Sequence, residues 1–144
     1  SSSPDSKNAV EPGKRPVSSM APTLVVKNGE PFLTIGTPGG SRIITMVLHG
    51  LLAHADGEPV DQWVSKPRFH HQYLPDIVMY ENDAFDEELE QELSLRGHIL
   101  KKQMSPYGGG FGNYGNMQAV VWDKSNNKVT AASDRRGIGA AVVK

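Results

Sequence analysis

The chain has 144 residues, of which 38% are hydrophobic and 22% charged, as in a globular domain that buries a core. Its 15 basic and 16 acidic residues leave a net charge of −1, so electrostatics give no reason to expect a nucleic acid or an anionic membrane as a partner. Cysteine is absent, which excludes disulfides, thiolate metal sites and a cysteine nucleophile, and no apolar run approaches the roughly 20 residues of a membrane span.

The first part of the chain predicts an arm followed by a hairpin. Residues 1–16 are rich in Ser, Pro, Gly and charge and have almost nothing to bury, which indicates an extended arm or linker. Two strands follow, Thr23 to Val26 and Pro31 to Ile35. They are joined at Asn28-Gly29, a preferred corner of a tight β-hairpin.

The second strand runs into a glycine-rich turn, Gly36 to Arg42, and then into apolar positions spaced as on one face of a helix from Ser41 to about Ala55. The backbone N–H groups of Gly39, Gly40 and Ser41 would begin this helix without partners, at the end where the helix dipole is positive. Such donors can bind a phosphate, a carboxylate or an oxyanion, and glycine lets a ligand approach closely. A plain strand-to-helix turn is the simpler interpretation of this local pattern, which matches neither Walker A nor G-x-G-x-x-G.

A pair of serines, Ser18-Ser19, lies between two prolines and is therefore expected in extended or turn backbone. The hairpin brings this pair toward the end of the sheet at which the glycine turn begins. Two hydroxyls and two backbone donors are thus expected to converge there.

The rest of the chain predicts an α+β order with helices over a mostly antiparallel sheet. Adjacent His70 and His71 would point to opposite faces of a strand, so no metal site is expected. The glycine-rich Tyr107 to Asn116 predicts a surface loop, because no strand-then-helix context makes it a nucleotide site. The predicted elements are a helix from Glu58 to Trp63, an extended segment from Arg68 to Tyr73, a strand from Asp76 to Tyr80, a helix beginning at Asp86 and ending at Gly97, a strand from His98 to Lys101, and a hairpin of Met117 to Trp122 with Val129 to Ala132.

Blocks of sequence in a fixed order, from about Asn8 onward, carry a family resemblance. They are Pro12 to Thr23, Gly36 to Ile43 and Pro67 to Gln72, and the closing Ala132 to Gly137 also fits. On these residues the chain resembles the C-terminal part of the small subunit of γ-glutamyltransferases (γ-glutamyl transpeptidases), of the N-terminal-nucleophile hydrolase superfamily. The resemblance implies part of a four-layer αββα sandwich, with residues 17–144 forming the C-terminal portion of a single domain.

The resemblance also implies a chemistry. The γ-glutamyl group of glutathione and similar amides passes to water or an amine acceptor through a γ-glutamyl-threonine ester, with the terminal amine as base. It assigns Ser18 and Ser19 to the substrate's α-carboxylate, and the backbone N–H groups of Gly39 and Gly40 to the oxyanion hole. It implies no cofactor and no metal.

The departures from the family's pattern matter for this chemistry. The family's nucleophilic threonine lies upstream of the serine pair, and residues 1–17 contain no threonine. Thr37 stands where serine is frequent, and Arg135 where proline is common. We therefore expect the C-terminal segment of a larger, self-processed enzyme, whose partners are the large subunit and an upstream threonine-bearing segment. Family habit implies a periplasmic, secreted or cell-surface location.

Two alternatives stay open at this point. One is a related acylase of the superfamily with another acyl group, such as a glutaryl or cephalosporin acylase, although the serine pair suits the carboxylate of an α-amino acid. The other is a non-catalytic homologue that serves as an interaction module.

Overall fold

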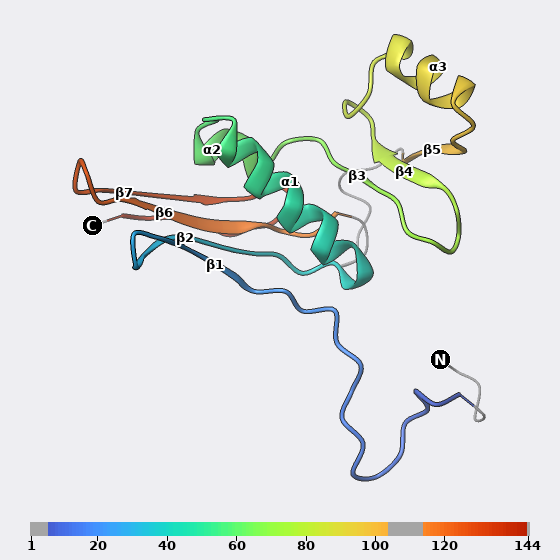
Figure 1. Ribbon diagram of the computed structural model, residues 1–144, viewed down its shortest axis with the longest axis horizontal. Coiled ribbons are helices and arrows are strands. Elements are labelled where there is room, and N and C mark those ends of the chain that lie inside the picture. The colour runs from blue at the N-terminus through green and yellow to red at the C-terminus, as the bar shows by residue number, and fades with distance from the viewer. Residues whose placement is uncertain (1–5, 104–113, 144) are drawn as a thin grey trace.

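The computed structural model describes residues 6–103 and 114–143, and its main feature there is a four-stranded sheet. Its strands lie in the order β1-β2-β6-β7, and each neighbouring pair is antiparallel. Two helices, α1 (Ile43–Ala55) and α2 (Val60–Trp63), lie over one face of this sheet (Figure 1), and the short 3-10 helix η1 (Gly40–Arg42) leads into α1. The strands are β1 (Thr23–Lys27), β2 (Glu30–Gly36), β6 (Gln118–Asp123) and β7 (Lys128–Ser133).

A smaller sheet lies beside the main one, with the order β3-β4-β5 (Figure 1). Strands β4 and β5 are parallel because α3 (Glu87–Leu95) carries the chain back between them, whereas β3 and β4 are antiparallel. The strands are β3 (Phe69–His70), β4 (Val78–Glu81) and β5 (Leu100–Gln103). The predicted α+β class with mostly antiparallel strands is confirmed.

The local predictions agree with this arrangement. Asn28 and Gly29 both have positive φ, 54° and 81°, as the predicted tight corner requires. Helix α3 begins as predicted, because the Asp86 carboxylate accepts a hydrogen bond from the Leu89 N–H at 2.8 Å. Of the predicted glycine loop, residues 107–113 lie outside the described residues.

The core lies between the main sheet and α1 and α2. Alternate residues of β2 and β6 point toward the helices, and the side chains of the helices meet them there. Trp63 of α2 belongs to this core and is only 2% exposed. The buried cluster includes Leu33, Ile35, Ala119 and Val121 of the strands, with Met46, Val47 and Trp63 of the helices.

The opposite face of the main sheet is also apolar but is exposed. Leu24 and Val26 of β1, and Val120 and Trp122 of β6, are between 38% and 56% exposed. A sheet that is apolar on both faces is typical of a layer covered on both sides. In the described part of the chain, no helix is long and apolar enough to cross a membrane.

A buried ion network joins segments that are far apart in sequence. The Arg68 guanidinium donates to Asp134 Oδ2 at 2.7 Å, and both side chains are at most 1% exposed. Arg136 bridges the same Asp134, through Oδ1 at 2.9 Å, to Glu81. Arg68 further donates to the backbone carbonyls of Val64 and Tyr114. Desolvation lowers the pKa of Arg68, and the charge of Asp134 acts in the opposite direction. The network therefore fastens α2, β4 and the end of β7 together.

We expect Asp134→Ala to lower the free energy of unfolding by about 3–5 kcal/mol, because the buried Arg68 charge would lose its partner. Chemical denaturation of the intact protein measures this change. The matched control is Asp83→Ala, at an exposed aspartate, which should shift the unfolding free energy by less than about 0.5 kcal/mol. Equal shifts for the two variants would contradict the importance of the network.

Candidate active site

The glycine turn between β2 and α1 adopts a backbone that favours glycine. Gly39 has φ 151° and ψ 12°, and Gly40 has φ 60°. The carbonyls of these two residues accept the N–H groups of Arg42 and Ile43, which begin the helix. Among the described residues, however, no acceptor lies opposite the N–H of Gly39 or of Gly40. Within residues 6–103 and 114–143, these two adjacent backbone donors therefore have no partner, and backbone donors at the start of a helix are a common place for an anion to bind.

The two glycines differ in what surrounds them. A Cβ on Gly39 would lie 2.2 Å from Met46 Cε, so the α1 side chain packs directly on this residue. A Cβ on Gly40 would meet no atom of the described residues within 4 Å. Packing therefore fixes Gly39, whereas the described part of the chain leaves the Cβ side of Gly40 open.

The segment after residue 113 supports the turn from one side. The Asn116 N–H donates to Thr37 Oγ1 at 3.1 Å, and the Thr37 hydroxyl donates to the Pro38 carbonyl at 2.9 Å. Gly115 makes this approach possible, since a Cβ there would lie 2.1 Å from Thr37 Oγ1 and 2.4 Å from the Pro38 oxygen. The turn is thereby held against the start of β6.

A polar network from β3 supports the turn from another side. The Ser41 hydroxyl donates to Gln72 Oε1 at 2.8 Å, and the same oxygen lies 2.9 Å from His70 Nε2. The other ring nitrogen of His70 lies 2.9 Å from Thr45 Oγ1. His70 is buried and its neighbour His71 is exposed, so the predicted opposite orientation is confirmed.

The serine pair lies in extended chain ahead of β1. Because Thr23 is paired with Ile35, β1 begins at the end of the sheet where β2 leads into the glycine turn. Figure 1 shows the chain ahead of β1 passing this end of the sheet. Ser18 Oγ accepts the Met20 N–H at 3.1 Å, and Ser19 is partly buried. No hydrogen bond links the serine pair to Gly39 or Gly40 in residues 6–103 and 114–143, so the structure brings the pairs to one end without joining them.

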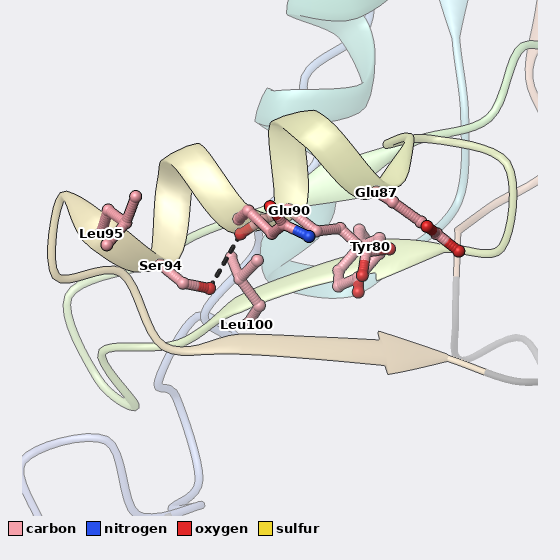
Figure 2. Close-up of a pocket in the computed structure, with 7 residues that line it drawn as sticks. Tyr80, Glu87, Glu90, Ser94, Leu95 and Leu100 are labelled. Atoms are coloured by element: carbon pink, nitrogen blue, oxygen red, sulfur yellow. Dashed lines mark hydrogen bonds between the residues drawn. The ribbon is translucent and has the colours of Figure 1, made fainter.

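A surface hollow lies elsewhere, between α3 and the strands β4 and β5 (Figure 2). Its polar groups serve local structure: Ser94 Oγ donates to the Glu90 carbonyl at 2.8 Å, and the Glu90 carboxylate pairs with Lys102 at 3.3 Å. It contains none of the predicted site residues. It is lined by Tyr80, Glu87, Glu90, Gln91, Ser94, Leu95 and Leu100.

In the described ranges, no group of three or more His, Asp or Glu side chains is placed to hold a metal ion.

Comparison with known proteins identifies the family. The family model described as "Gamma-glutamyltranspeptidase" matches residues 1–144. The chain belongs to the γ-glutamyltranspeptidase family. The N-terminal-nucleophile hydrolase fold of this family explains an α+β layer pair whose sheet is apolar on its second face.

Individual relatives agree with this membership. The glutathione hydrolase proenzyme of Escherichia coli is 55% identical over 100 residues, which are 67% of this chain and 17% of that protein. The proenzyme of the same name from Pseudomonas aeruginosa is 39% identical over 140 residues, covering 94% of this chain and 23% of its own length. The chain thus spans about a fifth of the length of these curated relatives.

A solved structure supports the same fold. The γ-glutamyltranspeptidase from Pseudomonas nitroreducens complexed with L-DON superposes with a TM-score of 0.80 at 36% identity. The superposition covers 97% of this chain and 69% of that one.

Sequence reasoning missed the residues that support the glycine turn. It singled out Pro67 to Gln72 as a family block but gave no role to His70 or Gln72, and it treated Asn116 as part of a loop. Adjacency in sequence does not show that these side chains meet the turn. A histidine followed two residues later by a glutamine in extended backbone is the one signal that could have found them, because this spacing places both side chains on the same side.

The histidine beside this network predicts a pH effect. The His49 ring packs on Phe69 with centroids 4.5 Å apart, and desolvation, then the charges of Arg68 and His70, lower the pKa of His49 below 6.5. Above pH 6.5 the residue is neutral in both the folded and the unfolded state. Below pH 6.5, the unfolded chain binds a proton at His49 more readily than the folded protein does. The free energy of unfolding therefore decreases as the pH is lowered.

We expect His49→Gln to flatten the fall of the unfolding midpoint between pH 7.5 and pH 5.5, measured by denaturant titration of the intact protein. His98→Gln, at an exposed histidine, should leave the slope as in the parent. A parental slope in the His49 variant would contradict the prediction.

Proposed function

We propose that this chain is part of a γ-glutamyltransferase that cleaves glutathione and other γ-glutamyl amides and passes the γ-glutamyl group to water or an amine acceptor. The observation that supports this most directly is that the adjacent N–H groups of Gly39 and Gly40 have no acceptor among the described residues, in a chain of this family. Attack on the γ-carbonyl places negative charge on its oxygen. Two preorganised N–H groups stabilise that charge as it develops.

In this proposal the chain's own residues bind and orient the substrate. Ser18 and Ser19 donate hydrogen bonds to the α-carboxylate, while Gly39 and Gly40 hold the oxyanion. In the substrate, the γ-carbonyl lies three carbons from the α-carbon that bears the carboxylate. The distance between the serine pair and the glycine pair at the end of the sheet then selects the γ-carbonyl as the group that reacts. The nucleophile is the threonine that the family resemblance implies, in a segment outside these 144 residues.

The proposal includes partners and a location. A large subunit and a threonine-bearing segment of the same precursor complete the domain that residues 17–144 form in part. The exposed apolar face that carries Leu24, Val26 and Trp122 is a surface suited to a covering layer. By family resemblance, the enzyme works in the periplasm or outside the cell.

The test uses the complete precursor protein and release of aniline from a γ-glutamyl anilide. We expect Gly40→Ala to reduce kcat/KM by about 10²-fold or more, since this proposal places the substrate oxygen against Gly40 and an added methyl group, with no described atom within 4 Å of it, would compete for that space. Its cost in stability should be only about 1–2 kcal/mol, from the left-handed backbone.

Gly57→Ala is the matched control, because Gly57 has φ 83° and also has nothing within 4 Å of an added Cβ. This variant should lose similar stability but keep its activity. Equal kcat/KM values for the Gly40 and Gly57 variants would exclude the donor role.

A second prediction concerns the serine pair. In the complete protein, the double change Ser18→Ala, Ser19→Ala should reduce kcat/KM for the γ-glutamyl anilide by about 10²-fold or more, because each hydrogen bond to a charged group contributes about 1.5–3 kcal/mol. A butyryl anilide, which has no carboxylate, should react equally slowly with the parent and the variant.

The same assay separates the alternatives. A parent that prefers a glutaryl anilide would indicate a related acylase. A correctly processed parent with no activity on any of these anilides would indicate a non-catalytic homologue.

A further inference from the structure

Two hydroxyls, one helical turn apart, tie the start of α1 to strand β3. Ser41 lies directly after Gly40 in η1, and Thr45 lies four residues further on, so both point to one side of the helix. Ser41 Oγ contacts Gln72 Oε1 at 2.8 Å, and Thr45 Oγ1 contacts His70 Nδ1 at 2.9 Å. His70 Nε2 and Gln72 Oε1 close the chain of hydrogen bonds at 2.9 Å.

In this series of hydrogen bonds, the orientation of each group follows from the contact between Gln72 and Leu74. Gln72 Nε2 donates to the Leu74 carbonyl at 2.6 Å, so Oε1 is the amide atom that faces Ser41 and His70. An oxygen can only accept, so His70 Nε2 carries a hydrogen. In the neutral ring Nδ1 then accepts from the Thr45 hydroxyl. Every polar atom of the His70 ring is thereby satisfied, as its exposure of 2% requires.

The hydrogen bond from Ser41 to Gln72, the tie between α1 and β3, holds the residue that directly follows the candidate donor Gly40. Gly40 has no side chain, and no atom of the described residues lies within 4 Å of the place where its Cβ would be. Its N–H direction therefore depends on its neighbours: Gly39, packed under Met46, and Ser41, bonded to Gln72. Stabilising an oxyanion requires donors held to within a fraction of an ångström.

We propose that His70 and Gln72 are positioning residues that hold the Gly40 N–H in its productive direction through Ser41, an inference that rests on the proposed γ-glutamyl transfer. They touch neither substrate nor reacting atoms. Their loss should therefore lower kcat and leave KM nearly unchanged, because the serine pair that binds the carboxylate is untouched.

The experiment compares variants of the complete precursor protein with the γ-glutamyl anilide. Gln72→Met removes the shared acceptor at similar volume, and Ser41→Ala removes the donor. Each should reduce kcat by roughly ten- to a hundredfold, the effect of a small misplacement of a catalytic group. The double variant should lose no more than the worse single variant, because both changes break the same link. Ser41→Thr keeps the hydroxyl and should restore kcat to within about twofold.

Ser94→Ala is the matched control, since Ser94 also bonds through its hydroxyl, but to the Glu90 carbonyl on α3. It should leave kcat unchanged. A parental kcat for Ser41→Ala, or losses that multiply in the double variant, would overturn the positioning role.

A second readout separates this proposal from the proposed function. Amide hydrogen exchange should be faster across Gly39 to Ile43 in Ser41→Ala and Gln72→Met than in the parent, and should return toward the parental rate in Ser41→Thr. If the parent has no γ-glutamyl activity, the proposed function fails while exchange still tests the tie. Unchanged exchange in both variants would overturn the tie whatever the activity.

Discussion

The buried pair of Arg68 and Asp134 is the constraint on which the rest of this structure depends. Each charge is removed from water, so each needs the other, and the geometry that satisfies both leaves little freedom. Asp134 also accepts the Met117 N–H at 3.1 Å, and Arg68 donates to the carbonyls of Val64 and Tyr114. The pair thus fixes where α2, the start of β6 and the end of β7 meet.

Hydrogen bonds connect this junction to the glycine turn. Arg68 leads into β3, whose His70 and the following Gln72 reach the hydroxyls at the start of α1. On the other side, Asn116 lies just before the Met117 that Asp134 anchors, and it bonds to Thr37. A turn made of flexible residues is in this way held at both ends by groups that belong to the rigid junction. The glycines of this turn can therefore hold a defined conformation, because the neighbouring residues that bond to the turn restrict it.

The main sheet has two apolar faces, and the helices of the described residues cover one of them. One face packs on Met46 and Trp63, and the other carries Leu24 and Trp122 in contact with solvent. Burying the second face would remove apolar surface from water, which stabilises by about 25 cal/mol for each Å² buried. An exposed apolar face of this kind suits a covering layer, and the curated relatives are several times longer than this chain.

The main elements and the family resemblance could be predicted from the amino-acid sequence alone. Asn28-Gly29 predicted the hairpin, the apolar spacing after Ser41 predicted α1, and the adjacent histidines predicted opposite orientations, since each depends on residues close together in the chain. The roles of Gly39, Gly40, Ser18 and Ser19 also came from the sequence and stay predictions. Three contacts could be found only in the folded structure: Gln72 with Ser41, Asn116 with Thr37, and Arg68 with Asp134. These partners are separated by 31, 79 and 66 residues, and no local pattern specifies contacts at such distances, because they follow from how the layers pack.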